Sequence, residues 1–139
     1  MIVLDTNVIS SIMRDVPDRR IVDWLNRMPE ASIWLTTISI FELRHGIELL
    51  ADSRRRRQLE NHFAHVLDTD IQGRILPFDE NAAAIAATIA ARRRQNGRLT
   101  EIRDTFIAGI IVSRRADFAT RNVRHFKDLK IRVLDPWAE

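Results

Sequence analysis

Four polar residues share one kind of position, next to segments whose apolar pattern predicts strands or buried helices. Asp5 directly follows the apolar run at residues 2 to 4, and Asn122 follows a later short apolar segment, in ATRN. Glu42 lies early in an apolar helical stretch, and Asp104 opens the most apolar helical stretch of the chain. Because the carboxyl ends of parallel strands meet at one edge of a sheet, these side chains are predicted to converge there.

Carboxylates that converge at one edge need a counter-charge. Two carboxylates about 4 Å apart repel each other by about 4 kcal/mol at an effective dielectric constant of about 20. Protonation, arginine partners or a divalent cation would each relieve this repulsion. Oxygen ligands without a thiol or an adjacent histidine pair suit Mg²⁺ or Mn²⁺. Such a cation could activate water and neutralise charge on a phosphodiester, so the pattern predicts metal-assisted hydrolysis.

Each acidic residue also has a structural interpretation. Asp104 could cap its helix or interact with the helix dipole, and Glu42 could pair with Arg44 or Arg103. Asp5 is harder to interpret in this way, because strand ends in α/β folds are favoured positions for function.

The four histidines are interpreted as surface or structural residues. His62 and His65 lie one helical turn apart, but the spacing places no acidic third ligand beside them. His45 and His125 stand alone in the sequence.

Composition excludes several classes of chemistry. The chain has no cysteine, which rules out disulfides, thiolate zinc sites and cysteine nucleophiles, and it fits a reducing cytoplasm. Gly73 and Gly97 belong to no glycine-rich phosphate loop, and no serine occupies a nucleophile elbow. Neither a membrane-spanning segment nor a signal peptide is expected, because the apolar runs are short and no basic region precedes the first.

Positive charge comes almost entirely from arginine. The net charge is +3, and the only lysines are Lys127 and Lys130. Arginines at residues 54 to 57 and 92 to 94 form two runs, which could guide an RNA backbone because arginine binds phosphate bidentately. They could equally be solvated helix faces.

Alternating strand and helix patterns predict an α/β fold with a mostly parallel sheet of about five strands, in one domain over residues 1–139. Apolar runs predict strands at residues 2–4, 32–38, 75–78, 117–120 and 132–134. Helical periodicity predicts helices near residues 6–13, 19–28, 40–50, 53–67, 80–94 and 100–112. Thr6 and Ser39 are the predicted N-caps of the first and third helices, and Thr100 is predicted to open the last. The alanine-rich helix at 80–94 is expected to approach a neighbour closely.

Five segments in order resemble the PIN-domain ribonucleases, specifically toxins of the VapC and FitB type. They are VLDTNVIS, FELRHGIELL, RILPFDENAA, RDTFIAGIIV and FATRNVRHF, and the resemblance extends over essentially the whole chain. It implies a three-layer α/β/α sandwich and an endoribonuclease that depends on Mg²⁺ or Mn²⁺.

Carried onto this sequence, the resemblance implies that Asp5, Glu42 and Asp104 are metal ligands and that Thr120 and Asn122 line the same pocket. Many relatives have a fourth acid where this chain has Asn122. A neutral amide is a weaker ligand, so Asn122 is expected to orient water or phosphate rather than anchor the cation.

The resemblance also implies partners: an RNA substrate, a second copy in a homodimer, and a small antitoxin that fills the acidic pocket and assembles with operator DNA. Two alternatives stay open, a housekeeping PIN nuclease without an antitoxin and a non-catalytic basic module that binds nucleic acid. A haloacid-dehalogenase-type phosphatase is disfavoured, because that chemistry needs a second aspartate two residues after the first, where this chain has Asn7.

Overall fold

A parallel sheet of five strands forms the centre of the computed structural model, which describes residues 1–139. The strands lie in the order β3-β2-β1-β4-β5, and every neighbouring pair is parallel. Their bounds are β1 Ile2–Leu4, β2 Ile33–Thr36, β3 Ile75–Leu76, β4 Asp117–Ala119 and β5 Val133–Leu134. The predicted parallel α/β sheet is therefore confirmed, with each strand at or within the predicted segment.

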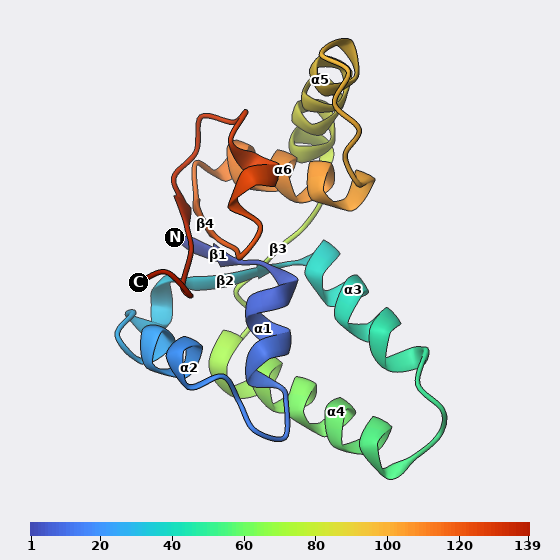
Figure 1. Cartoon of the computed structure of the whole chain (residues 1–139), viewed down its shortest axis with the longest axis vertical. Coiled ribbons are helices and arrows are strands. Elements are labelled where there is room, and N and C mark those ends of the chain that lie inside the picture. The colour runs from blue at the N-terminus through green and yellow to red at the C-terminus, as the bar shows by residue number, and fades with distance from the viewer.

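Helices cover both faces of the sheet and make three layers. On one side lie α1 Thr6–Ile12, α2 Arg19–Asn26, α3 Thr37–Glu48 and α4 Arg54–His65, and on the other lie α5 Glu80–Gln95 and α6 Ile102–Arg114 (Figure 1). Shorter elements are the 3₁₀ helices η1 Glu30–Ser32 and η3 Val123–Phe126 and the π-helix η2 Val66–Ile71. None of the helices combines the length and the apolar character that crossing a bilayer requires.

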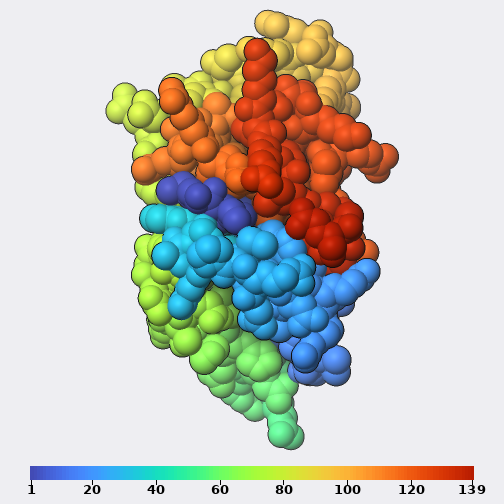
Figure 2. Space-filling model, turned by 90° about the vertical axis from the view of Figure 1, so that its left-hand side faces the viewer, coloured from blue at the N-terminus to red at the C-terminus, as the bar shows by residue number.

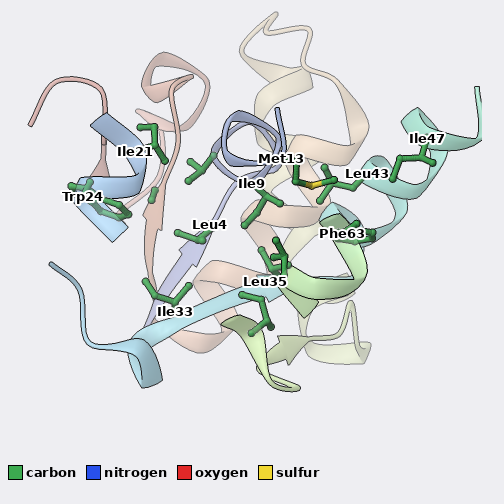
Figure 3. Packing of buried hydrophobic residues seen from close by; sticks show 14 residues of the cluster. Leu4, Ile9, Met13, Ile21, Trp24, Ile33, Leu35, Leu43, Ile47 and Phe63 are labelled. Carbon is green, nitrogen blue, oxygen red and sulfur yellow. The ribbon is translucent and has the colours of Figure 1, made fainter. Parts of the chain in front are cut away.

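Alternate residues along the strands feed two separate cores, because successive side chains of a strand point to opposite faces. Leu4 and Ala119 belong to the core beneath α1 to α4, whereas their neighbours Val3 and Phe118 belong to the core beneath α5 and α6. Figure 3 shows the first core, in which Leu4 and Leu35 from the strands lie near Ile9, Leu43 and Phe63 from the helices. The central strands are thus buried on both faces, as continuous apolar runs predict.

The close approach expected for the alanine-rich helix occurs between α5 and α6. A Cβ atom added at Gly109 would lie 2.5 Å from the carbonyl oxygen of Ala82 and 2.8 Å from the Cβ atom of Ala86. Only a residue without a side chain fits this crossing, which brings α6 into close contact with α5.

The helix starts differ from the sequence predictions. Asp5 caps α1 in place of Thr6, and Thr36 caps α3 in place of Ser39, whose backbone N–H instead donates to the Thr36 hydroxyl. Glu101 caps α6 in place of Thr100. The side chains of Asp5, Thr36 and Glu101 each accept a hydrogen bond from a backbone N–H of the helix that they cap. An N-cap bond of this kind from a Ser, Thr, Asp or Asn side chain stabilises a helix by about 1 kcal/mol. The cap of α1 is therefore the residue directly after β1, and the cap of α3 is the last residue of β2, so a polar side chain stands at the end of both strands at this edge of the sheet.

Candidate active site

Asp5 lies at the carboxyl end of β1, with its side chain in the interior of the protein. Its Oδ1 accepts a hydrogen bond from the backbone N–H of Thr6 at 2.8 Å, and its Oδ2 accepts one from the Thr120 hydroxyl at 2.7 Å. The Asn7 amide donates a longer bond of 3.3 Å to Oδ2. Asp5 is only 6% exposed, and every hydrogen-bond donor that reaches it is neutral.

The charge of Asp5 is poorly compensated. Burial raises the pKa of the Asp5 carboxyl to about 6, although the bonds from Thr120 and Thr6 act in the opposite direction. The negative charges of Asp104 and Glu42 raise this pKa further, by electrostatic repulsion of the ionised Asp5 carboxylate. Asp5, Glu42 and Asp104 therefore lie near enough for their charges to interact, and the ionised form of Asp5 lacks a cationic partner.

Glu42 reaches the same edge from the second turn of α3. Its Oε1 accepts a hydrogen bond from the Thr6 hydroxyl at 2.8 Å, which ties α3 to the residue directly after Asp5. Its Oε2 lies 3.8 Å from Nε of Arg103. Of the two pairings left open by the sequence, Arg103 is the one that forms, while Arg44 stacks over the Phe63 ring at 5.2 Å.

Asp104 lies in the first turn of α6 with its carboxylate at the rim of the site. Its Oδ2 is 3.3 Å from Nδ1 of His125, which belongs to η3. Sequence reasoning missed this neighbour, since His125 had been interpreted as an isolated histidine. Its position three residues after Asn122, in the loop that follows β4, is the signal that could have identified it.

Thr120 and Asn122 follow β4 and complete the edge. Thr120 is fully buried, and its hydroxyl links two candidate site residues, because it donates to Asp5 and accepts from the backbone N–H of Asn122 at 3.0 Å. Asn122 is exposed, and its side-chain amide makes no hydrogen bond within the chain. This amide is therefore free to contact a ligand.

The donor atoms of this edge suit a hard divalent cation. Asp5, Glu42 and Asp104 offer only oxygen ligands, and the uncompensated charge of Asp5 is what a cation would neutralise. No group of three or more acidic or histidine side chains is arranged closely enough to surround an ion directly. Mg²⁺ characteristically keeps several waters and binds through one or two carboxylates, so the open arrangement fits it.

The other charged candidates make no hydrogen bond or ion pair with Asp5, Glu42 or Asp104. His62 and His65 are on the exposed surface of α4, and Nδ1 of His62 is 3.1 Å from the Met13 carbonyl oxygen. Arg54, Arg55 and Arg57 are exposed, as expected for a solvated face. In the second run Arg93 is 2% exposed, which excludes it from any contact with an RNA backbone.

Comparison with known proteins places these residues in context. The PIN domain model matches residues 2–131. The chain is 35% identical over 137 residues to Toxin FitB of Neisseria gonorrhoeae, covering 99% of both chains, and 31% identical to VapC ribonuclease Y4jK of Sinorhizobium fredii, covering 99% of this chain and 98% of that one. The solved structure of FitAB bound to a DNA fragment superposes with a TM-score of 0.88 at 34% identity, covering 99% of this chain and 96% of that one.

Proposed function

The chain belongs to the PIN-domain family, and from this membership we propose that residues 1–139 act as one domain, a metal-dependent endoribonuclease that is the toxin of a type II toxin–antitoxin pair. The observation that carries the proposal is Asp5, a buried acid with no cationic partner beside two further acids. Capping of α1 accounts for one oxygen of Asp5, but it does not require two further acids beside it. The names of the relatives, a toxin and a ribonuclease, support the biological role.

Asp5, Glu42 and Asp104 are the residues that would hold Mg²⁺ or Mn²⁺. A bound divalent cation supplies charge neutralisation at the phosphodiester and makes water a stronger nucleophile. Its presence would also keep the Asp5 carboxylate ionised at neutral pH, against the burial that raises its pKa.

The remaining site residues act on orientation. The Thr120 hydroxyl fixes one oxygen of Asp5, and the Thr6 hydroxyl fixes one oxygen of Glu42, so both carboxylates are held before any ligand arrives. Asn122 offers an amide that can donate to a phosphate oxygen without repelling its acidic neighbours. We assign it this orienting role rather than that of a metal ligand.

The proposed partners follow from the same family membership. We propose that the protein forms a homodimer in the cytoplasm, and that a small antitoxin inhibits it by covering the acidic edge and joins it to operator DNA. The solved structure of FitAB with DNA supports this assembly for a relative of similar sequence. A short reading frame overlapping the start of this gene would favour the toxin over a housekeeping nuclease.

The proposal is tested with purified, antitoxin-free protein and total RNA, with Mg²⁺, with Mn²⁺ and with EDTA. Cleavage is expected only with metal, and Asp104→Ala should abolish it. Asn122→Ala should retain a measurable part of the activity, because an orienting amide contributes less than a ligand. Asp68→Asn, which neutralises an exposed acid away from the site, is the matched control and should cleave normally. Cleavage that persists in EDTA would refute the metal-dependent mechanism.

A further inference from the structure

Two tryptophan indoles fix the C-terminal residues against α2 and its N-cap. The indole N–H of Trp137 donates to Oδ2 of Asp18 at 3.0 Å, and that of Trp24 donates to Oε2 of Glu139 at 2.7 Å. Figure 2 shows the dark red C-terminal residues against the blue residues near α2. The bond from Trp137 holds the pKa of Asp18 below its ordinary value, so the acceptor is a carboxylate and the indole is firmly held.

Arg121 lies on this fixed indole. It directly follows Thr120, whose hydroxyl is bonded to Asp5, and its backbone N–H points to Oδ1 of Asn7 at 3.5 Å. The central carbon of its guanidinium is 5.0 Å from the centroid of the Trp137 ring, a cation–π distance. The face of the Trp137 ring therefore positions the side chain of Arg121, the residue that follows the buried Thr120.

Apart from its contact with Trp137, the guanidinium of Arg121 has no hydrogen-bond or ion-pair partner within the chain. Arg121 is exposed and takes part in none of the ion pairs of the structure. Arg103, which pairs with the candidate acid Glu42 at 3.8 Å, is also engaged by Glu101 at 3.0 Å. Arg121 thus combines a position fixed on Trp137 with unused N–H donors.

A cluster of acids repels RNA, so a substrate that reaches Asp5 needs a cation at the rim of the site. A stacked guanidinium offers a planar fork of donors that matches a phosphate, and stacking reduces the side-chain entropy lost on binding. We propose that Arg121, held on Trp137, binds the RNA phosphate adjacent to the one that is cleaved. This inference rests on the proposed function, because it assigns a substrate-binding residue to the same site.

The test measures binding of a labelled single-stranded RNA in EDTA, as a function of salt, for the full chain. Arg121→Gln is expected to weaken binding about tenfold and to reduce the slope of log affinity against log salt by about 0.7, the loss of one phosphate contact. Arg121→Lys should leave the salt slope unchanged, because the positive charge remains. It should still bind RNA less tightly than wild type, because lysine lacks the planar guanidinium that donates two bonds to a phosphate. Lys130→Gln, which removes an exposed positive charge ahead of the amino end of β5, is the control and should change neither.

A second comparison separates positioning from folding. Trp137→Leu should weaken RNA binding when Arg121 is present and have no further effect in the Arg121→Gln background, because the ring acts through the arginine. An unchanged salt slope for Arg121→Gln in a wild-type protein that cleaves RNA with Mg²⁺ would overturn this inference alone. A wild type that neither binds nor cleaves RNA would overturn the proposed function and this inference together.

Discussion

Asp5 and Arg93 are both charged residues in the interior, yet their surroundings are opposite. Arg93, 2% exposed, donates to both carboxylate oxygens of Asp128, at 2.8 and 3.1 Å. It also donates to the Thr105 hydroxyl at 3.1 Å and to the His125 carbonyl at 2.9 Å. Asp5 is nearly as buried but receives bonds only from neutral groups.

The pKa values of the carboxyl groups at the two positions record this difference. The hydrogen bond from Arg93 holds the pKa of Asp128 below its ordinary value, whereas burial raises that of Asp5 to about 6. Removing one partner of a buried ion pair destabilises a protein, because the remaining charge is left unmatched. A buried charge that has no partner destabilises the ligand-free protein for the same reason. Arg93 and its partners therefore support the scaffold, whereas the unmatched charge of Asp5 agrees with the role proposed for it in the candidate site.

The two regions also touch. Through Thr105, Arg93 contacts the residue after Asp104, and through the His125 carbonyl it fixes the loop whose imidazole faces Asp104. The compensated charge thus positions part of the rim around the uncompensated one.

Removing the compensated charge should have the largest effect on stability. Arg93→Met leaves Asp128, Thr105 and the His125 carbonyl without their donor, and we expect the free energy of unfolding to fall by about 3 kcal/mol, the lower end for a broken buried pair because Asp128 is partly exposed. Urea denaturation of Arg93→Met against Arg92→Met, an exposed neighbour, measures it. Equal stability of the two variants would show that Arg93 does not support the scaffold.

Removing the uncompensated charge should act in the opposite direction. The native pKa of about 6 against 3.8 for the ordinary carboxyl means that native Asp5 binds its proton more tightly than the unfolded chain does. In EDTA, the contribution of Asp5 to stability should therefore fall as pH rises from about 4 to about 6, by at most about 3 kcal/mol.

The difference between wild type and Asp5→Asn isolates this contribution from that of the other carboxyl groups. Asn retains N-capping of α1, so the variant should be the more stable protein at pH 8 and lose that advantage at pH 4. Addition of Mg²⁺ at pH 8 should stabilise wild type more than the variant. A stability difference independent of pH would contradict the uncompensated-charge interpretation.

The smallest of the three effects is expected for Asp104→Asn. Its charge adds to the repulsion at Asp5, but the side chain is 23% exposed and lies near His125, so solvent and the imidazole screen it. In EDTA the variant should be more stable than wild type by less than about 1 kcal/mol, while cleavage is lost. Thermal melts of wild type, Asp104→Asn and the control Asp68→Asn in EDTA decide whether the substitution stabilises or destabilises the protein. A clearly lowered melting midpoint for Asp104→Asn would make Asp104 a structural residue.

Much of the scaffold follows from local sequence patterns. The apolar runs around Val3 and Phe118 fix buried strands, because a segment without polar side chains can only be accommodated between two covered faces. Once those strands are parallel, Asp5 and Thr120 must stand at the same edge, so the core of the candidate site is predictable from residue type and order.

Only the tertiary structure decides which charges are matched. The Arg93–Asp128 pair joins residues 35 positions apart, and the bond from Thr6 to Glu42 joins residues 36 apart. Helical spacing places Arg93 on the same face of α5 as Ala86 and Ile89, but it does not reveal that Asp128 lies opposite. The sequence by itself therefore determined the strands and the acids at their ends. Whether each charge became scaffold or site was decided by packing, because the pKa and the hydrogen bonds of a buried group depend on neighbours that are distant in the chain.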